Sequence, residues 1–492
     1  MMSGELKPYP AYKDSGVKWL GEVPKHWEVE RLKRCMANII EQTNVRNDGE
    51  LYIGLEHVES WTGRLMKVDE DIEFDSQVKS FEAGDILFGK LRPYLAKVTR
   101  PTRKGVCVGE FLVLRPRDKR IVGACIERLL RAKPMIDAVD GSTFGAKMPR
   151  ADWQFIGPMP IAIPPVPEQS TIVRFLDHAD RRIRHSIRAK EKLIALLEEQ
   201  KQVTIHHTVT GRIDVRTGCP YPTYKTSDIE WFEQLPAHWE DRRLKSLVKR
   251  IDQGVSPQAE NQLADDTSWG VLKAGCVNGG VFRETEHKRL PRQIEVDPVL
   301  AVRTGDVLVS RASGSPRFVG SVGRILSLRH NLILSDKIFR PIFNHAVDPD
   351  FMVFAMNCQY YRQQVRKAIS GAEGLANNLP LSSLKSFRFS IPSLDEQLGI
   401  VAHLRDATEK LATSIAKTTR EVDLLREYRT RLIADVVTGK LDVREAAAAL
   451  PEEPDDPDAA ETDCAEPEGG DDSHPHRDRW TEVPATQREM MS

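Results

Sequence analysis

Two different segments of this chain of 492 residues occur twice, in the same order. Residues 8–33 match residues 220–245 without a gap, and 14 of the 26 aligned positions are identical. Residues 163–179 match residues 391–407 at a second constant offset, again without a gap. Matches of this length indicate an internal duplication, which has to be recognised before any other feature of the fold. We therefore expect the order A–B–A′–B′, where A and A′ begin with the first repeat and B and B′ with the second.

The B and B′ segments are predicted to be long amphipathic helices. Proline precedes each segment, and Glu168 and Glu396 fall in the first turn, where the helix dipole favours a carboxylate. Gly211 and Gly439 follow the last apolar position of each pattern, as expected for helix ends. The apolar residues recur at spacings of three and four, at Val173, Leu176, Ile183, Ile187, Ile194 and Leu197, and at Val401, Leu404, Leu411, Ile415, Val422, Leu425 and Leu432.

Two equal amphipathic helices most simply bury their apolar stripes against each other. Each helix of about 40 residues would be about 60 Å long at 1.5 Å per residue. We therefore expect an intramolecular coiled coil. The alternative is that each helix lies on its own globular domain, although about 40 residues is longer than a small domain needs.

The A and A′ segments are predicted to be mixed α/β domains that differ from each other. Between the repeats, residues 34–162 and 246–390 share little beyond Gly-Asp-[Ile/Val]-Leu at 84–87 and 305–308. The expected strands include residues 52–55, 86–88, 106–108 and 110–114 in A, and 307–309, 318–322 and 337–342 in A′. Helices are expected at residues 121–133 and 350–370. The repeated segments thus form a duplicated frame. This frame carries two different inserts, residues 34–162 and residues 246–390.

Charge divides the chain into a basic body and an acidic end. Residues 445–492 contain 15 acidic and 3 basic residues, whereas residues 1–444 carry a net charge of +11. A basic body favours a polyanionic partner, with an ordinary solvated surface as the alternative. The acidic end is rich in proline and almost without large apolar residues, so we expect it to be disordered.

Several functional classes lack their sequence signals. No apolar run is long enough to predict a membrane span, the N-terminus has no apolar signal segment, and the seven cysteines form no C-x-x-C pair. We therefore expect a cytoplasmic protein without a metal site. Phosphate-binding, nucleophile-elbow and zinc-protease motifs are also missing, which favours a binding protein over an enzyme.

The ordered set of duplicated motifs resembles the specificity subunit of Type I restriction–modification systems. The motifs are W-x-x-x-x-P-x-H-W-E-x-x-R-L-K at 19–33 and 231–245, the G-D-[IV]-L elements, residues 141–173 and 377–401, and the V-T-G-x-[IL]-D-V-R segments at 209–216 and 437–444. The resemblance covers residues 8–444. It implies an α+β fold with a pseudo-two-fold repeat, in which two mixed α/β target recognition domains are separated by two long antiparallel helices. We accordingly expect a first recognition domain at 1–165, a first long helix at 166–210, a second recognition domain at 211–392, a second long helix at 393–438 and an acidic disordered tail at 439–492.

The resemblance also implies a function without catalysis in this chain. Such a subunit binds double-stranded DNA, and because the two inserts differ we expect an asymmetric, bipartite target. The implied partners are two modification (methyltransferase) subunits and restriction (ATP-dependent nuclease) subunits. S-adenosylmethionine, ATP and Mg²⁺ are expected in those partners, and no cofactor in this chain. The alternatives are a coiled-coil scaffold that joins two protein-binding modules, and the specificity subunit of a Type II restriction-methylation system.

The candidate DNA-contacting residues are basic, amide, hydroxyl or aromatic side chains near glycine or proline, mostly in loops after the G-D-x-L element of each copy. Lysine and arginine suit phosphate contacts, and arginine, lysine or amide side chains suit base edges. The candidates are Lys90, Arg92, Tyr94, Lys97, Lys147 and Arg150 in the first domain, and Arg311, Ser313, Ser315, Arg317, Asn377 and Asn378 in the second. Trp19, Trp27, Trp231 and Trp239 recur in both copies, so we expect them to pack the frame or to form part of a partner-docking surface.

Overall fold

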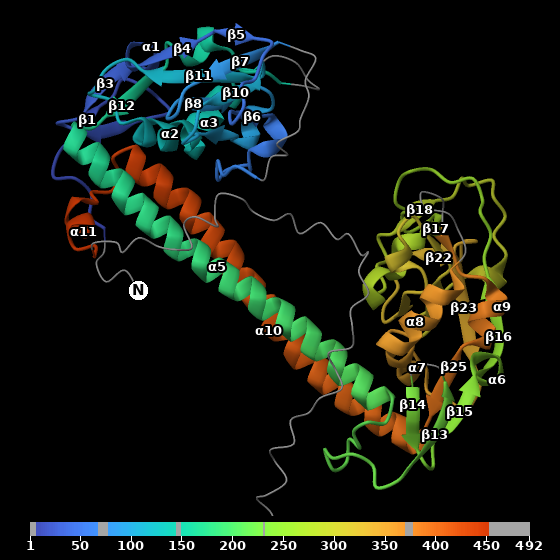
Figure 1. Ribbon diagram of the computed structural model, residues 1–492. Helices are drawn as coiled ribbons and strands as arrows, with labels where there is room; N and C mark the ends of the chain where they lie inside the picture. The colour runs from blue at the N-terminus through green and yellow to red at the C-terminus, as the bar shows by residue number, and fades with distance from the viewer. Residues whose placement is uncertain (1–5, 67–76, 144–148, 230–231, 370–376, 452–492) are drawn as a thin grey trace, which may run out of the picture. The chain divides into compact units, whose positions relative to one another are not determined.

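The computed structural model describes residues 6–66, 77–143, 149–229, 232–369 and 377–451 (Figure 1). The chain forms two compact units. Unit 1 comprises residues 1–187 and 423–492, and unit 2 comprises residues 188–422. Each unit therefore contains one insert, the first part of one long helix and the last part of the other, so the duplication is interleaved between the units.

The two B segments form helices α5 (Val166–Val209) and α10 (Leu394–Val437), each of 44 residues, and the two helices begin at equivalent positions of the repeat. In unit 1, Phe175 of α5 and Val436 of α10 belong to one buried cluster. In unit 2, Ile205 of α5 and Leu404 of α10 share another. The beginning of each helix thus lies beside the end of the other, so the helices run antiparallel. The expected intramolecular coiled coil is confirmed.

Ion pairs supplement the apolar contacts between the two helices. Asp180 of α5 pairs with Arg429 of α10 in unit 1, and Lys190 Nζ lies 2.5 Å from Glu421 Oε2 in unit 2. On α5 in unit 2, Leu193 remains 45% exposed and Leu196 52% exposed. A pair of helices can bury only the stripe on which they meet, so these two leucines lie outside it.

Both inserts contain the same central antiparallel sheet despite their different sequences. In unit 1 the strand order is β4 (Met36–Ile39), β11 (Phe111–Pro116), β8 (Ile86–Gly89) and β9 (Val98–Thr99). In unit 2 it is β16 (Val248–Gln253), β23 (Ile338–Phe343), β19 (Val307–Ser310) and β21 (Val322–Arg324). The G-D-x-L elements lead into β8 and β19, which are equivalent inner strands with all four residues buried.

A second sheet is also shared, and each copy contains one parallel pair. Its order in unit 1 is β5 (Gln42–Thr43), β7 (Val78–Phe81), β10 (Gly105–Val108) and β6 (Leu51–Ile53), and β6 pairs with β10 in parallel. Its order in unit 2 is β18 (His287–Arg289), β17 (Trp269–Leu272) and β22 (Asn331–Ile333), and β17 pairs with β22 in parallel. The inserts therefore share the central sheet and this parallel pair, but the antiparallel neighbour joins β10 in unit 1 and β17 in unit 2.

The repeated segments supply short strand pairs and helices around these sheets. The strand pairs are β1 (Tyr12–Asp14) with β2 (Glu22–Pro24), β3 (Glu28–Arg31) with β12 (Pro160–Ile163), β13 (Tyr224–Ile229) with β14 (Phe232–Pro236), and β15 (Glu240–Arg243) with β25 (Arg388–Ile391). The helices are α1 (Leu32–Cys35), α2 (Gly123–Arg131), α3 (Lys133–Asp140) and α4 (Trp153–Ile156) in unit 1, and α6 (Leu244–Leu247), α7 (Pro349–Ala355), α8 (Gln359–Ala368) and α9 (Leu381–Ser386) in unit 2.

Two of the expected elements were wrong in extent. The helix expected at residues 350–370 is interrupted after Ala355, and α8 begins at Gln359 behind the extended Cys358. The strand expected at 318–322 begins only at Val322, because Phe318 ends a short 3₁₀ turn, η5 (Pro316–Phe318). In both places a local turn interrupts the expected element.

A buried glutamine joins each long helix to its insert. Gln169 is fully buried in the first turn of α5, where it accepts a hydrogen bond from Val122 N and donates to Pro164 O, both at 2.8 Å. Gln397 of α10 accepts from Asp348 N at 2.7 Å and donates to Pro392 O at 2.9 Å. Val122 and Asp348 are the residues that precede α2 and α7. Each glutamine thus fixes a helix of the insert on the start of its own long helix.

The C-terminal end of each long helix packs on one copy of the first repeat. The end of α10 packs on residues 8–33, and the end of α5 packs on residues 220–245. Gly439 has φ +80°, and a Cβ there would lie 2.3 Å from Pro24 Cδ and 3.1 Å from Trp27 Cζ3. Gly211 has φ +70°, and its Cβ would lie 2.5 Å from Pro236 Cγ and 3.2 Å from Trp239 Cη2. The expectation that these glycines follow the helix ends is confirmed, and both also allow a close approach of backbone to the frame.

We expect Gly439→Ala to lower the free energy of unfolding of unit 1 by about 3 kcal/mol, combining left-handed backbone strain with overpacking. Gly16 is the matched control, since its φ is +69° but no atom lies within 4 Å of the position that a Cβ would take. Gly16→Ala should therefore cost only the backbone strain, about 1 kcal/mol. Urea unfolding followed by circular dichroism measures both, and equal costs would contradict the docking role of Gly439.

Part of the segment assigned to the acidic tail is folded. Residues 439–451 belong to unit 1, where α11 (Arg444–Ala448) follows α10, and Asp442 N donates to Lys7 O at 2.8 Å. Val443 and Ala447 are buried in the unit 1 core. The assignment of the tail was therefore wrong for residues 439–451, which provide apolar side chains to that core. Residues 452–492 lie outside the described residues.

Candidate nucleic-acid interface

In unit 1, the loop after β8 lies against the segment that precedes α4. Leu91 forms a bridge with Arg150, Ala151 N donates to Lys90 O at 2.9 Å, and Arg92 N donates to Pro149 O at 2.9 Å. Three of the candidates, Lys90, Arg92 and Arg150, are therefore brought together by backbone hydrogen bonds. Lys147 lies outside the described residues.

The unit 1 candidates differ in how free their side chains are. Arg92 is exposed and has φ +52° at the start of a 3₁₀ turn, η2 (Pro93–Leu95), in which Tyr94 is 44% exposed. Lys97 donates to Leu55 O at 2.7 Å, and burial lowers the pKa of its ammonium group. Arg150 Nη2 donates to Glu110 Oε1 at 2.9 Å. Arg92 and Tyr94 are thus presented to solvent, whereas Lys97 is bound to the domain itself.

In unit 2, the loop after β19 makes the equivalent contact through strands β20 (Ala312–Ser313) and β24 (Asn377–Asn378). Ala312 pairs with Asn378, and Ser313 pairs with Asn377. Arg311 N donates to Lys337 O at 2.7 Å, and Arg311 O accepts from Leu379 N at 2.8 Å. The structure therefore brings Arg311, Ser313, Asn377 and Asn378 together.

The unit 2 candidates also differ in whether their side chains are bonded within the domain or exposed to solvent. Arg311 Nη1 donates to Asp336 O at 3.0 Å, and Asn377 is buried. Ser313 Oγ accepts from Ser315 N at 3.3 Å, which shapes the turn between them. Arg317 is exposed in η5, and its guanidinium carbon lies 5.9 Å from the centre of the Phe318 ring.

The two loops have the same backbone arrangement but different side chains. The Leu91–Arg150 bridge of unit 1 corresponds to the Ala312–Asn378 pair of unit 2. Lys90, Arg92 and Arg150 consequently occupy the places of Arg311, Ser313 and Asn378. Two equivalent platforms with different hydrogen-bond donors could read different base sequences, because base edges are distinguished by their donor and acceptor patterns.

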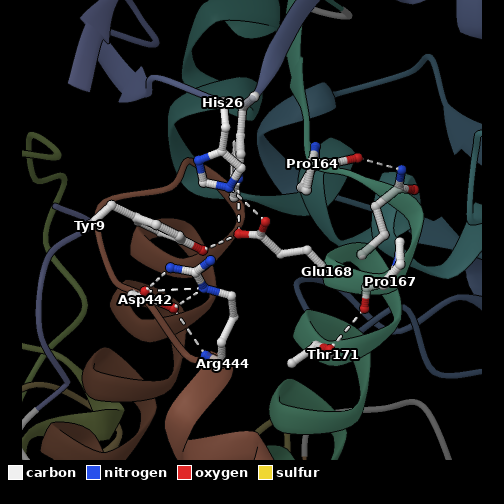
Figure 2. Close-up of polar contacts among 10 residues, drawn as sticks. Tyr9, His26, Pro164, Pro167, Glu168, Thr171, Asp442 and Arg444 are labelled. Atoms are coloured by element: carbon white, nitrogen blue, oxygen red, sulfur yellow. Dashed lines mark hydrogen bonds and ion pairs between the residues drawn. The ribbon is translucent and has the colours of Figure 1, made fainter. Parts of the chain in front are cut away.

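A cluster of polar residues around Glu168 holds the frame of unit 1 together (Figure 2). The Glu168 cluster comprises Tyr9, His26, Trp27 and Glu168. The Glu168 carboxylate is only 6% exposed and accepts from the Tyr9 hydroxyl at 2.6 Å, from His26 Nε2 at 2.8 Å and from Trp27 Nε1 at 3.0 Å. Burial and the adjacent Glu168 raise the pKa of the Tyr9 phenol, which therefore stays protonated as a donor.

Unit 2 contains the equivalent cluster with one difference. Glu396 accepts from the Tyr221 hydroxyl at 2.5 Å and from His238 Nε2 at 3.0 Å. Trp239 is fully buried at the place of Trp27, but within the described residues its Nε1 has no hydrogen-bond partner. The two copies thus share their packing but not all of their hydrogen bonds.

An arginine from the segment after the neighbouring helix end lies near each cluster. Arg444 lies over the Tyr9 ring with its guanidinium carbon 5.1 Å from the ring centre, and Arg444 Nη2 donates to Asp442 Oδ2 at 2.6 Å, as Figure 2 shows. In unit 2, Arg216 Nη2 donates to Asp214 Oδ2 at 2.8 Å. The V-T-G-x-[IL]-D-V-R motif therefore supplies an aspartate–arginine pair at the same point of both units.

Neither a metal centre nor a membrane segment is found in the part of the chain that the structure describes. No group of three or more histidine, cysteine, aspartate or glutamate side chains there is arranged to hold a metal ion. None of the described helices is both long enough and apolar enough to cross a membrane.

Comparison with known proteins points to one group. The chain is 27% identical over 213 residues to the Type I restriction enzyme EcoEI specificity subunit of Escherichia coli, which covers 43% of this chain and 35% of that protein. It is 22% identical over 456 residues to the Type I restriction enzyme MjaVIII specificity subunit of Methanocaldococcus jannaschii, which covers 88% of this chain and 97% of that protein. The chain is therefore similar to Type I restriction–modification specificity subunits. No family model matches it.

A solved structure shows a similar fold. A chain described under complex assembly and conformational transition of the Type I restriction–modification system matches with a TM-score of 0.65 and 17% identity, over 85% of this chain and 99% of that one. The expected α+β fold with two long antiparallel helices is therefore confirmed. The alignments with the EcoEI and EcoDI specificity subunits span only 35% and 38% of those proteins.

The least predictable residues of the frame were Glu168 and Glu396. The sequence assigned them to the helix dipole, and they do lie in the first turn of their helices. Their carboxylates, however, also bind the tyrosine and histidine of the first repeat. The available signal was that each glutamate, tyrosine and histidine is retained in both copies.

Proposed function

We propose that this chain is the DNA-binding specificity subunit of a Type I restriction–modification complex and reads an asymmetric, bipartite target. The observation that carries the proposal is one frame with two equivalent loop platforms whose side chains differ. Each platform would read one half of the target, with Lys90, Arg92 and Arg150 in unit 1 and Arg311, Ser313 and Asn378 in unit 2 among the contacting residues. Tyr94, Lys147, Ser315 and Arg317 complete the proposed contacts, whereas Lys97 and Asn377 would support the two loops from within.

We further propose that the chemistry is supplied by partner subunits in the cytoplasm. Two modification subunits would bring S-adenosylmethionine, and restriction subunits would bring ATP and Mg²⁺. The duplicated frame supports two equivalent docking positions, because the Glu168 cluster and its counterpart around Glu396 are built from the same residue types. The proposed domain limits are those of the duplication, with the first helix at 166–210 and the second at 393–438.

The deciding experiment is to co-express the chain with the modification subunit encoded beside it and to map methylated adenines in the host genome by single-molecule sequencing. We expect a split, asymmetric motif that depends on this chain. If a soluble complex forms but binds no DNA and leaves no new methylation, the proposal is overturned and a coiled-coil scaffold becomes the better description.

Arg92 should matter more for DNA than Lys97. Arg92 is exposed, whereas the Lys97 ammonium group is occupied by Leu55 O. We expect Arg92→Gln to weaken DNA binding about tenfold and to reduce the salt dependence by about one ion, as loss of one phosphate or base contact would. Lys97→Gln should mainly lower thermal stability. Fluorescence anisotropy at several salt concentrations measures the difference, and a larger DNA effect for Lys97→Gln would reverse the assignment.

A further inference from the structure

Unit 1 contains a cavity of about 780 Å³ that the proposed target contacts do not use. It lies between α2, the first part of α5, the turn that carries Arg64 and the segment after β9. Among the residues that the structure describes, seven arginines and five acidic residues line it. This volume is in the range of small-molecule sites, and the excess of arginine favours an anion.

The floor of the cavity is a network of arginine–carboxylate pairs. Arg131 Nη1 lies 2.5 Å from Glu127 Oε1, and Arg128 pairs with Asp177 of α5. Arg131 is only 6% exposed, and burial together with the nearby Arg128 and Arg429 lowers the pKa of its guanidinium, against the opposing effect of Glu127. The floor therefore holds buried guanidinium groups whose charges are balanced by carboxylates.

Three hydrogen-bond donors around the cavity lack acceptors. The Nε atoms of Arg64, Arg128 and Arg131 are buried and have no hydrogen-bond partner within the described part of the chain. Buried donors are nearly always satisfied in folded proteins, because an unmade hydrogen bond to a charged group is costly. Three incompletely satisfied guanidinium groups therefore surround one cavity, which favours an anionic occupant rich in acceptor oxygens.

The rim adds cationic side chains held by a tight turn. Arg64 O accepts from Glu59 N at 2.9 Å, which closes the turn that carries Arg64. A Cβ at Gly63, where φ is +70°, would lie 2.0 Å from Arg131 Nη1, so this turn rests directly on Arg131. Within the described residues, neither Arg64 nor Arg100 forms an ion pair, which leaves both available to a ligand.

The cavity is not part of the duplicated frame. The α5 residues that line it, Asp177, Asp180 and Arg184, align in the repeat with Arg405, Thr408 and Ala412 of α10. The residues that hold the frame together, such as Glu168, are retained in both copies. A site specific to unit 1 is therefore better explained by a ligand than by the common architecture.

We propose that this cavity binds a phosphate group, through the arginine donors of its floor and rim. The phosphate could belong to the DNA backbone or to a free nucleotide, since both present the same tetrahedral oxyanion. The DNA source rests on the function proposed above, and the nucleotide source does not.

The test uses the full chain and three probes, namely inorganic phosphate, ADP and a short DNA duplex that contains the methylated motif, in chloride buffer. Arg64→Gln and Arg100→Gln remove rim cations without disturbing the buried floor. Arg34→Gln is the matched control, because this substitution removes the same charge. Arg34 is exposed in unit 1 and does not line the cavity. Circular dichroism and thermal melting establish that each variant is folded.

A DNA phosphate predicts that Arg64→Gln weakens duplex binding about tenfold and lowers its salt dependence by about one ion, whereas Arg34→Gln does neither. If the ligand is a free nucleotide, Arg64→Gln should lower the affinity for ADP, measured by calorimetry, about tenfold and leave duplex binding unchanged. Binding of ADP by a wild-type chain that binds no duplex would sustain the cavity proposal and overturn the proposed function. If both folded rim variants equal Arg34→Gln with all three probes, the cavity holds only a structural ion-pair network and the proposal fails.

Discussion

Replacing residues 34–162 by the corresponding segment of another specificity subunit is expected to change one half of the methylated sequence completely and to leave the other half intact. The insert is attached at points that the frame defines. Its last strand, β12, pairs with β3 of the first repeat, and Gln169 of α5 accepts from Val122 N at 2.8 Å at the start of α2. A donor segment that keeps these backbone contacts should fold on the same frame.

The measurement is the methylated motif, read by single-molecule sequencing of a host that expresses the chimaera with its modification subunit. The matched control is replacement of residues 246–390, which should change only the opposite half-site. The strand pair β15–β25 and the contact of Gln397 with Asp348 N provide the equivalent attachment there. Simultaneous change of both halves, or an unaltered motif in a folded chimaera, would mean that the inserts do not read the half-sites independently.

The frame of this fold could be predicted because its signals are periodic or duplicated. Apolar spacing located both 44-residue helices, and glycine after the last apolar position located their ends. The retention of Trp27 and Trp239 in both copies correctly suggested a packing role, since both are fully buried beside Gly439 and Gly211. Local sequence was sufficient here because helix periodicity and chain reversal are local properties.

The shared topology of the inserts could not be predicted, because a sheet specifies which positions are buried and not which apolar residues fill them. The sequences of residues 34–162 and 246–390 therefore diverged while β6–β10 and β17–β22 kept the same parallel pairing. The Glu168 cluster could not be predicted from the sequence either, since its hydrogen bonds join residues more than 140 positions apart. The burial of Val443 and Ala447 likewise depends on a core built by the opposite end of the chain.

The candidate DNA contacts were predictable only as a region. The G-D-x-L elements located the loops after β8 and β19, and the structure places Lys90 and Arg311 at equivalent points of these loops. Sequence could not distinguish a free cation from one already engaged, such as Lys97, because its partner Leu55 is distant along the chain. The arginine-lined cavity was missed for the same reason, since its residues come from segments that are far apart in the sequence.

Truncation of the buried tryptophan of unit 1 is expected to have the largest effect on stability. Trp27 is fully buried, its ring centre lies 5.7 Å from that of Tyr9, and its Nε1 donates to Glu168 at 3.0 Å. We expect Trp27→Ala to lower the free energy of unfolding of unit 1 by about 5 kcal/mol, because it leaves a large cavity and removes a hydrogen bond to a buried carboxylate. Urea unfolding followed by circular dichroism and by hydrogen exchange of unit 1 measures this loss.

The second copy provides a control that separates packing from hydrogen bonding. Trp239 is equally buried, and its ring centre lies 5.8 Å from that of Tyr221, but its Nε1 has no partner within the described residues. Phenylalanine preserves much of the packing in either place. Trp27→Phe should therefore cost about 1.5 kcal/mol more than Trp239→Phe, since only the former deprives a carboxylate of a donor. Equal costs would show that the Trp27–Glu168 hydrogen bond contributes nothing, and that packing alone explains why tryptophan occupies both positions.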